Sequence, residues 1–318
     1  MKRFYWRRTL RIFPLYFSFL LIVTLVFILM KQPVGIEVLF PYLYSYTLNF
    51  GIGIVDMPGN LLLNYLWSLS FEEQFYLLWP VLIFLLPRRG ILYLCIGILL
   101  LSPLTRYFLA EYWIAESGSR NQIGGMIYYL PFGQLDTFAT GALLAVWRGG
   151  ARIKKPLLIF GLAFGAFVLA GFLNAISVGS SVPNYCFSSF GYPIASLYNG
   201  QHVWGYSLIN LVAATGVLVA IHPAKSAGGW LRKFLEMPWL VWIGRISYGL
   251  YIIHWPVQYA LEKLFHIPYD VPLRLLLFLP YLALVLGLSW LSFRYFESWF
   301  MKKKSSKWNS PPDSAIEE

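Results

Sequence analysis

Residues 67–80 read WSLSFEEQFYLLWP, and the apolar block around this stretch, Leu61–Leu86, is long enough to cross a membrane as a helix. A spanning helix needs about 20 mainly apolar residues. Seven further blocks are similar: Pro14–Met30, Ile91–Leu109, Leu130–Trp147, Pro156–Ala175, Val203–Ile221, Leu240–Glu262 and Leu273–Phe296. The sequence therefore predicts an all-α fold, a polytopic transmembrane helical bundle of about eight spans.

The composition excludes a water-soluble globule. Of the 318 residues, 58% are hydrophobic and 12% are charged, whereas an ordinary soluble domain has roughly 25% charged residues. The net charge of +11 would suit nucleic-acid binding in another context. Here the basic residues stand in short runs between apolar blocks, as charges that orient membrane helices do. We therefore expect membrane lipid, and no nucleic acid, as a partner.

Loop charge decides whether a ninth candidate, Val38–Val55, also crosses the membrane. A proline, an asparagine and two glycines interrupt this segment, which favours a re-entrant or interfacial piece. If it does not cross and the N-terminus is cytoplasmic, 18 of the 25 Lys and Arg residues face the cytoplasm. The outer set is Lys31, Arg106, Arg120 and Lys263, and a further three, Arg245, Arg274 and Arg294, lie within or at the edges of spans. The positive-inside rule then predicts a multi-pass protein of the inner (plasma) membrane with both termini in the cytoplasm.

Residues 1–300 are expected to form one membrane domain, and residues 301–318 a disordered cytoplasmic tail. No small-residue cleavage site follows Met30, so the first apolar block is expected to be a retained span. The two cysteines and four histidines lack the spacing of a metal site. We expect no metal and no bound cofactor.

Two adjacent carboxylates, Glu72 and Glu73, lie within the 67–80 stretch. A charge at the middle of a membrane costs about 2.5–3.5 kcal/mol on insertion scales, so each acid requires a reason. Ser70 and Glu73 fit a capping box at a helix start. Glu72 shares a helical face with Tyr76, and we predict that it is a catalytic residue. A buried ion pair between Glu72 and an arginine is the alternative.

Ser247, Tyr251 and His254 follow i, i+4, i+7 spacing and therefore share one face of a helix. A histidine titrates near neutrality and can act as a general base. The predicted topology puts His254 and Glu72 near the outer ends of their helices, so the two can lie at a similar depth. The alternative is an interfacial belt, where tyrosine, tryptophan and histidine are common.

Other polar residues suggest binding rather than chemistry. Arg8 and Arg11 share a face at the start of the first span, where their guanidinium groups suit a phosphate of a lipid or of a nucleotide-bearing donor. Orientation of the span is the alternative role. Asp136 is a lone acid among small residues in an apolar block, which predicts that it faces the bundle interior or a cavity.

Two connections are expected as outer loops, Ala110–Tyr129 and Ile176–His202. The second contains polar and aromatic residues suited to sugars or polar lipid heads: Asn184, Tyr185, Tyr192, Asn199 and Gln201. An ordinary solvated loop is the alternative interpretation.

Four stretches together resemble acyltransferase family 3, the integral-membrane O-acyltransferases that modify bacterial surface glycans and some lipids. They are FYWRRTLRIFPLYF (4–17), WSLSFEEQFYLLWP (67–80), LDTFATGALLA (135–145) and RISYGLYIIHWPV (245–257), in the order of the family. The resemblance implies transfer of an acyl group, usually acetyl, from cytoplasmic acyl-CoA to a hydroxyl of a glycan or glycolipid. It also implies that Arg8 and Arg11 help to hold the donor and that Glu72 belongs to the signature helix.

The resemblance has one departure. Members of the family usually begin with two further spans, which carry an arginine and a histidine taken to be the catalytic base. The sequence begins at the arginine segment that follows those spans. It is therefore expected to be an N-terminally truncated form, through a late start codon or an inactive gene copy, or a variant that uses another base such as His254.

Two other classes of function remain open from the sequence. In a secondary transporter or lipid flippase, Glu72 and Asp136 would be proton or ion sites. Against this class, no inverted repeat is evident in the sequence. A non-catalytic membrane scaffold is the third class, because the expected histidine base is missing.

Overall fold

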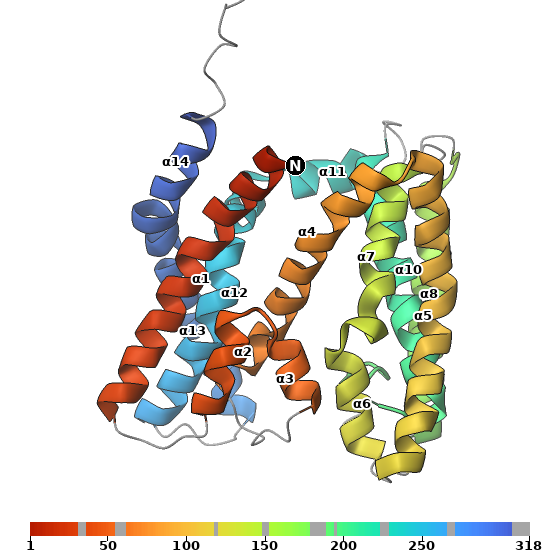
Figure 1. Cartoon of the computed structure of the whole chain (residues 1–318), viewed down its shortest axis with the longest axis horizontal. Helices are drawn as coiled ribbons and strands as arrows, with labels where there is room; N and C mark the ends of the chain where they lie inside the picture. Colours follow the sequence, from red (N-terminus) through yellow and green to blue (C-terminus); the bar gives the residue numbers. More distant parts are fainter. Residues whose placement is uncertain are drawn as a thin grey trace, which may run out of the picture. The chain divides into compact units, whose positions relative to one another are not determined.

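The computed structural model describes residues 1–30, 36–54, 62–117, 120–147, 153–178, 189–193, 196–222, 229–265 and 271–306. Helices are the only regular secondary structure among these residues, as Figure 1 shows, and this confirms the predicted all-α class. The chain divides into two compact units. Unit 1 comprises Met1–Ser45, Pro58–Leu66 and Met237–Glu318, and unit 2 comprises Tyr46–Met57 and Trp67–Glu236.

Unit 1 is built from three long helices, α1 (Lys2–Met30), α12 (Pro238–Phe265) and α13 (Val271–Ser292). Its shorter elements are η1 (Ile36–Leu39), α2 (Phe40–Tyr44), η2 (Asn64–Leu66), the π-helical turn η5 (Phe293–Glu297) and α14 (Ser298–Ser306). Helix α12 packs against α13, and α1 packs against α12 and α14. The hydroxyl of Tyr248 on α12 donates to the carbonyl of Ile12 on α1 at 2.9 Å, which joins these two helices.

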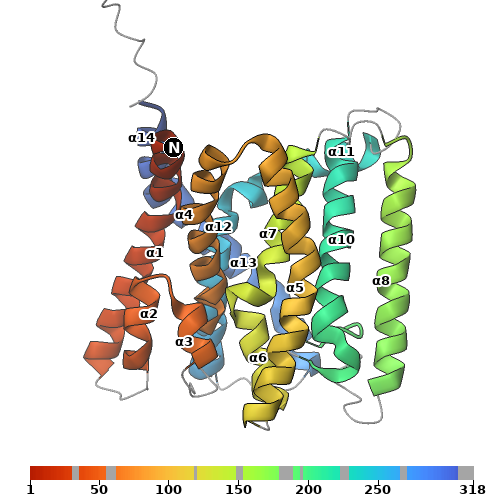
Figure 2. The ribbon, with the colours of Figure 1, turned by 45° about the vertical axis from the view of Figure 1, so that its right-hand side comes forward.

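Unit 2 contains α3 (Leu48–Ile54), α4 (Trp67–Leu85), α5 (Arg88–Ser117), α6 (Arg120–Tyr129), α7 (Pro131–Val146), α8 (Pro156–Val178), η4 (Tyr198–Gly200), α10 (Gln201–Ile221) and α11 (Gly229–Leu235). Helix α5 packs along α7, and α10 packs against α5, α7 and α8. Figure 2 shows α8 and α10 running side by side. Helix α4 is joined to α3 by a pair of side-chain amides, since Gln74 Nε2 donates to Asn49 Oδ1 at 2.9 Å.

Five of the described helices are long and apolar enough to cross a membrane: Lys2–Leu29, Arg88–Glu116, Pro156–Val178, Tyr198–Ile221 and Leu273–Lys303. The other three predicted spans correspond to α4, α7 and α12. These helices are not among the five, because each lacks either the length or the apolar sequence that a membrane span needs. Helix α7 has only 16 residues, and α4 begins with the polar WSLSFEEQ sequence. The count of about eight spans therefore stays a prediction.

The distribution of polar side chains is that of a membrane protein. Arg106, Asp136 and Asn174 are buried, whereas leucines such as Leu100 and Leu276 are about two-thirds exposed or more. In lipid, apolar side chains can cover the outside of a bundle while polar groups pair inside it. The chain is accordingly a membrane protein of α-helices.

Several local predictions were wrong. The predicted outer loop Ala110–Tyr129 is mostly helical, because α5 continues to Ser117 and α6 covers Arg120–Tyr129. Arg106, predicted to be a loop charge, lies within α5 and is fully buried. Ser70 lies inside α4, which begins at Trp67, so it is not the N-cap of a capping box. Its hydroxyl instead accepts from the backbone amide of Leu48 at 3.3 Å.

Other expectations concern short or terminal segments. The described part of Val38–Val55 forms short helices, α2 and α3, neither of which is long enough to span a membrane. Helix α14 extends to Ser306, into the segment 301–318 that we predict to be a tail. Residues 307–318 lie outside the described residues, as do Lys31, Asn184, Tyr185 and the side chain of Arg120.

Candidate functional site

Glu72 lines a pocket of about 450 Å³ within unit 2. We call this the Glu72 pocket. Its walls come from α4, α7 and α10, together with the end of α6 and the segment 192–193. The lining residues are Trp67, Ser68, Phe71, Glu72, Tyr128, Gln134, Thr137, Phe138, Tyr192, Pro193, Gln201, Gly205, Tyr206, Ile209 and Asn210. Among these residues, Glu72 is the one with an ionisable carboxylate.

Aromatic rings form much of the wall of the Glu72 pocket. The ring of Trp67 lies 4.8 Å from that of Tyr128, and Tyr128 stacks on Tyr206 with centroids 6.3 Å apart. Phe71 packs edge-on against Phe138 at 4.8 Å. Aromatic rings supply rigid, flat surfaces whose hydroxyl or indole groups can still form hydrogen bonds. Such a wall suits a ligand that has both apolar faces and hydroxyl groups.

Side-chain amides supply the polar part of the wall. Gln201 Nε2 donates to the carbonyl of Pro193 at 2.9 Å, and Gln201 Oε1 accepts from Asn174 Nδ2 at 3.1 Å. Asn210 is 8% exposed, and its Nδ2 has no hydrogen-bond partner among the described residues. A buried donor without a partner is unfavourable by about 1–3 kcal/mol. The amide of Asn210 is therefore a ready donor to a ligand in the pocket.

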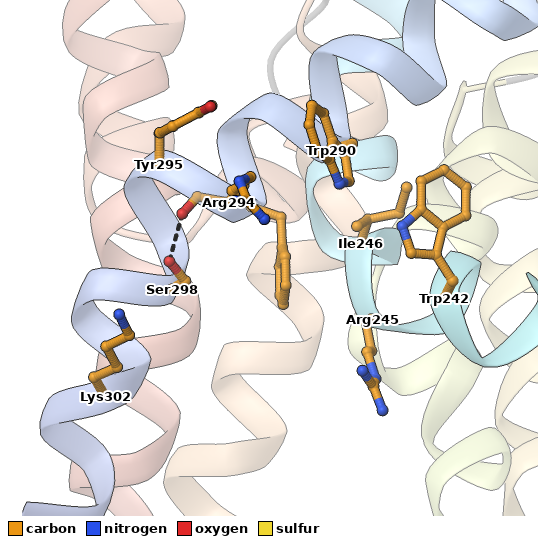
Figure 3. Close-up of a pocket in the computed structure, with 9 residues that line it drawn as sticks. Trp242, Arg245, Ile246, Trp290, Arg294, Tyr295, Ser298 and Lys302 are labelled. Atoms are coloured by element: carbon orange, nitrogen blue, oxygen red, sulfur yellow. Dashed lines mark hydrogen bonds between the residues drawn. The ribbon is translucent and has the colours of Figure 1, made fainter. Parts of the chain in front are cut away.

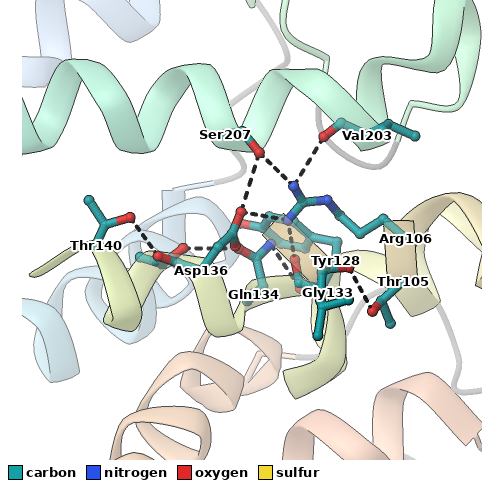
Figure 4. A network of polar contacts seen from close by, with 11 residues as sticks. Thr105, Arg106, Tyr128, Gly133, Gln134, Asp136, Thr140, Val203 and Ser207 are labelled. Carbon is teal, nitrogen blue, oxygen red and sulfur yellow. Dashed lines mark hydrogen bonds and ion pairs between the residues drawn. The ribbon is translucent and has the colours of Figure 1, made fainter. Parts of the chain in front are cut away.

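The walls of α7 and α10 are held by a buried ion pair that the sequence did not reveal. Arg106 Nη1 lies 2.9 Å from Asp136 Oδ2, and both side chains are almost completely buried. As Figure 4 shows, the same guanidinium also donates to the carbonyls of Gly133 and Val203 and to Ser207 Oγ, at 2.8–3.0 Å. Arg106 thus ties α5 to α7 and α10.

Asp136 faces the bundle interior, and its partner is Arg106. It does not line the Glu72 pocket, although its helix α7 provides Gln134 and Thr137 to that pocket. Tyr206 connects the two features, since its ring lies 5.3 Å from the Arg106 guanidinium and also lines the pocket. Asp136 thus pairs with Arg106 on the same helix that provides Gln134 and Thr137 to the pocket wall.

Tyr192 is held at the pocket by close packing on α8. Its hydroxyl donates to the carbonyl of Phe167 at 2.7 Å, and its ring stacks on that of Phe167 with centroids 4.4 Å apart. Burial raises the pKa of Tyr192 to about 12, and burial also raises the pKa of Tyr128. Burial thus favours the neutral form of both phenols, and the single O–H of Tyr192 is donated to Phe167.

The structure brings Glu72 and Tyr76 together as their spacing predicts. The hydroxyl of Tyr76 donates to Glu72 Oε2 at 3.3 Å, a long and therefore weak hydrogen bond. Tyr76 is not among the residues that line the Glu72 pocket. Glu72 itself is half-buried and lines the pocket.

In unit 1, Tyr251 and His254 come together, with ring centroids 5.7 Å apart. His254 Nδ1 lies 2.6 Å from the carbonyl oxygen of Tyr251. A carbonyl can only accept, so Nδ1 is the donor of this hydrogen bond, and Nε2 is the ring nitrogen that could accept a proton. Ser247 does not join this pair, because its exposed hydroxyl donates to the carbonyl of Gly244 at 3.0 Å. His254 and Glu72 belong to different units.

The two predicted donor-binding arginines lie on α1 in unit 1. Arg8 is half-buried and Arg11 is exposed. The carboxylate of Glu297 interacts electrostatically with Arg11. Any anionic ligand at Arg11 must therefore compete with this carboxylate. Within the described part of the chain, no group of three or more His, Cys, Asp or Glu is placed to hold a metal ion.

Sequence reasoning missed most of the pocket wall. In the sequence, Tyr192 and Gln201 stand out only as members of a polar loop, and Gln134 and Asn210 only as amides inside apolar blocks. An amide inside an apolar block is itself informative, because a polar group within a membrane segment is unfavourable unless it is paired or binds a ligand. The same argument would have directed attention to Arg106.

Comparisons with known proteins agree with the sequence motifs. Residues 1–294 match the family model Acyl_transf_3, described as an acyltransferase domain. The chain is 27% identical over 246 residues to O-acetyltransferase OatA of Staphylococcus aureus (strain NCTC 8325 / PS 47), covering 76% of this chain and 36% of that protein. It is 24% identical over 325 residues to a protein of strain MRSA252 that is named provisionally as an O-acetyltransferase.

That second match covers 98% of this chain and 49% of the relative, so the chain spans between about a third and a half of these relatives. No solved structure matches the chain. The family model, in contrast, covers nearly the whole sequence and includes all four motifs quoted above. The chain therefore belongs to acyltransferase family 3.

Proposed function

We propose that this chain acts as a membrane O-acyltransferase, which transfers an acetyl group from acyl-CoA to a hydroxyl of a cell-surface polysaccharide or glycolipid. The family and the O-acetyltransferase names of its relatives support acyl transfer. The observation that carries the proposal for this chain is the Glu72 pocket, where one carboxylate lies among aromatic rings and amides.

The acceptor hydroxyl binds in the Glu72 pocket. Sugars present apolar ring faces, which pack on aromatic side chains, and hydroxyl groups, which bond to amides and phenols. Trp67, Tyr128 and Tyr206 provide the flat surfaces, and Asn210 provides a buried donor that has no hydrogen-bond partner within the described part of the chain. A volume of about 450 Å³ can hold a sugar unit.

Glu72 acts as the general base in this proposal. Its carboxylate accepts the proton of the acceptor hydroxyl as the hydroxyl oxygen attacks the thioester carbonyl carbon. The C–O bond of the ester forms, the C–S bond breaks, and the thiolate of CoA leaves and takes up the proton. His254 is the second candidate base, because its Nε2 is free to accept while Nδ1 is held by the carbonyl of Tyr251.

Arg8 and Arg11 bind phosphates of the donor. They lie at the start of α1, which the charge distribution orients with its N-terminus in the cytoplasm, where acyl-CoA is found. Arg11 is exposed, and a donor phosphate would replace its interaction with Glu297. The transporter alternative has less support, since Asp136, one of its two ion sites, is paired with Arg106.

Acetyl transfer by membranes that contain the full chain tests the proposal. Labelled acetyl-CoA and a glycan acceptor are supplied, and labelled acceptor is measured. We expect Glu72→Gln to reduce transfer by a factor of about 10²–10⁴, the usual contribution of a general base. Glu111→Gln is the matched control, because Glu111 is an exposed carboxylate on α5 outside the pocket. Full transfer by Glu72→Gln would overturn the assignment of the base, and His254→Gln then tests the second candidate.

A further inference from the structure

Three arginines lie within or at the edges of apolar blocks, where a positive charge is unfavourable without a partner. The structure explains one of them directly, since Arg274 Nη2 lies 3.2 Å from Glu262 Oε1. The other two, Arg245 on α12 and Arg294 in η5, line the same pocket of about 500 Å³ in unit 1. Figure 3 shows this pocket, which we call the Arg294 pocket.

The Arg294 pocket combines positive charge with indole rings. Arg245, Arg294 and Lys302 bring three cations to it, and the residues that line it include no carboxylate. The others are Trp242, Ile246, Trp290, Phe293, Tyr295 and Ser298. Within the described residues, Arg245 and Arg294 form no salt bridge. Three like charges in one pocket repel one another and create a positive potential that attracts an anion.

Arg294 lies in the π-helical turn Phe293–Glu297. Its guanidinium lies 5.8 Å from the ring of Trp290 and 5.9 Å from that of Tyr295. Ser298 Oγ donates to the carbonyl of Arg294 at 2.6 Å and stabilises the turn. Stacking on rings leaves the N–H edges of a guanidinium available, and π-helical turns are frequent at functional sites.

We propose that the Arg294 pocket binds a phosphorylated ligand, with phosphate oxygens on Arg245, Arg294 and Lys302 and an apolar or flat part against Trp242 and Trp290. The planar fork of arginine matches the oxygens of a phosphate. For coenzyme A the inference rests on the proposed function, because the Arg294 pocket would then hold phosphates of the donor in addition to Arg8 and Arg11. Its test measures binding rather than transfer, so it can fail while the proposed transfer by Glu72 stands.

Two kinds of molecule at a membrane surface combine a phosphate with an apolar or flat part. One is the nucleotide of coenzyme A, whose adenine can stack on an indole. The other is an anionic lipid headgroup, which basic pockets between membrane helices bind on the cytoplasmic side. The two sources differ in a measurable way, since one is added from solution and the other from the bilayer.

The experiment uses the full chain in phosphatidylcholine nanodiscs. In one arm, coenzyme A is titrated and its binding is measured by calorimetry. In the other, phosphatidylglycerol is included in the nanodiscs, and lipid retained after extraction is counted by native mass spectrometry. We expect Arg245→Gln and Arg294→Gln each to weaken binding of one probe about tenfold, the loss of one charge-assisted contact. The arm that responds identifies the source.

Lys263→Gln is the matched control. It removes one positive charge from the other end of α12, where Lys263 is exposed and lies over the ring of Tyr259. Arg294→Lys keeps the charge without the fork, and we expect it to recover part of the affinity. If Arg294→Gln does not fold, the exposed Arg245 carries the test through Arg245→Gln. The proposal would be overturned if neither probe binds. It would also be overturned if each probe binds the wild type, Arg245→Gln and Lys263→Gln with the same affinity.

Discussion

The guanidinium of Arg106 connects three helices of unit 2, α5, α7 and α10. It is fully buried and reaches α7 through Asp136 and Gly133 and α10 through Val203 and Ser207. A buried charge is tolerated only when a counter-ion and hydrogen bonds compensate for lost hydration. These contacts supply both, so we infer that the pair stabilises the packing of α5, α7 and α10.

Removing one member of the pair should destabilise the protein strongly. We expect Asp136→Ala to lower the free energy of unfolding by about 3–5 kcal/mol, because it leaves a buried guanidinium without its counter-ion. The double variant Arg106→Leu/Asp136→Leu should lose less free energy of unfolding, because it leaves no unpaired buried charge. Denaturant unfolding in detergent measures both variants. Glu236→Ala is the control, with little expected change, because its pair with Arg232 is largely exposed. Similar small losses for Asp136→Ala and Glu236→Ala would contradict this account.

The phenol of Tyr192 should give unfolding a specific alkaline pH dependence. Its pKa is raised by burial to about 12, so folding favours the neutral form. The stability that this provides is present below pH 10, the ordinary pKa of tyrosine, and is lost as the pH rises toward 12. Tyr192→Phe should be less stable by about 1 kcal/mol at pH 8, the value of one hydrogen bond. The difference in stability between the wild type and Tyr192→Phe should shrink above pH 10, as measured by melting curves of both proteins at each pH. A difference that stays constant with pH would contradict this prediction.

At the scale of elements, the contact between α8 and the segment 189–193 positions Tyr192 and Pro193. Gly191 has a φ of +82°, which favours glycine, and a Cβ on Gly171 would lie 2.4 Å from the carbonyl oxygen of Phe190. Asn174 Nδ2 donates to the carbonyl of Gly191 at 2.7 Å. Small residues in a membrane helix permit this kind of close backbone approach.

Enlarging Gly171 should therefore impair acceptor binding more than chemistry. We expect Gly171→Ala to raise the KM for the glycan acceptor about tenfold, with kcat changed much less, because the pocket wall moves while Glu72 stays in α4. Gly165→Ala on the same helix is the matched control, since its Cβ would meet no atom within 4 Å. Acetyl-transfer kinetics with varied acceptor measure both variants. An unchanged KM for Gly171→Ala would show that the wall does not contact the acceptor.

For the whole molecule, the charge distribution predicts the orientation in the membrane. Arg106 is buried and no longer counts as an outer-loop charge, which makes the inner and outer loops still more unequal. The positive-inside rule then supports the cytoplasmic assignment of both termini more strongly. With this predicted orientation, we expect the Ile176–His202 connection, which contains Cys186, to lie outside.

Cysteine labelling in intact cells tests this orientation. A membrane-impermeant maleimide should label the wild type from outside and fail to label Cys186→Ser, because the other cysteine, Cys95, is fully buried. Labelling of inverted membrane vesicles serves as the complementary measurement. Label that enters only the inverted vesicles would show the opposite orientation.

The sequence by itself determined the class of fold, the membrane location and the family motifs, because apolar length, composition and short patterns are local properties. It also singled out Glu72 as a candidate site residue and predicted that it shares a helical face with Tyr76, four residues away, whose hydroxyl donates to it. Polar partners far apart in sequence were beyond its reach. Arg106 and Ser207 are separated by 101 residues, and Arg245 and Arg294 meet only through the packing of α12 on α13. The tertiary structure decided these partnerships, because buried charges find counter-ions or shared pockets only after the helices pack.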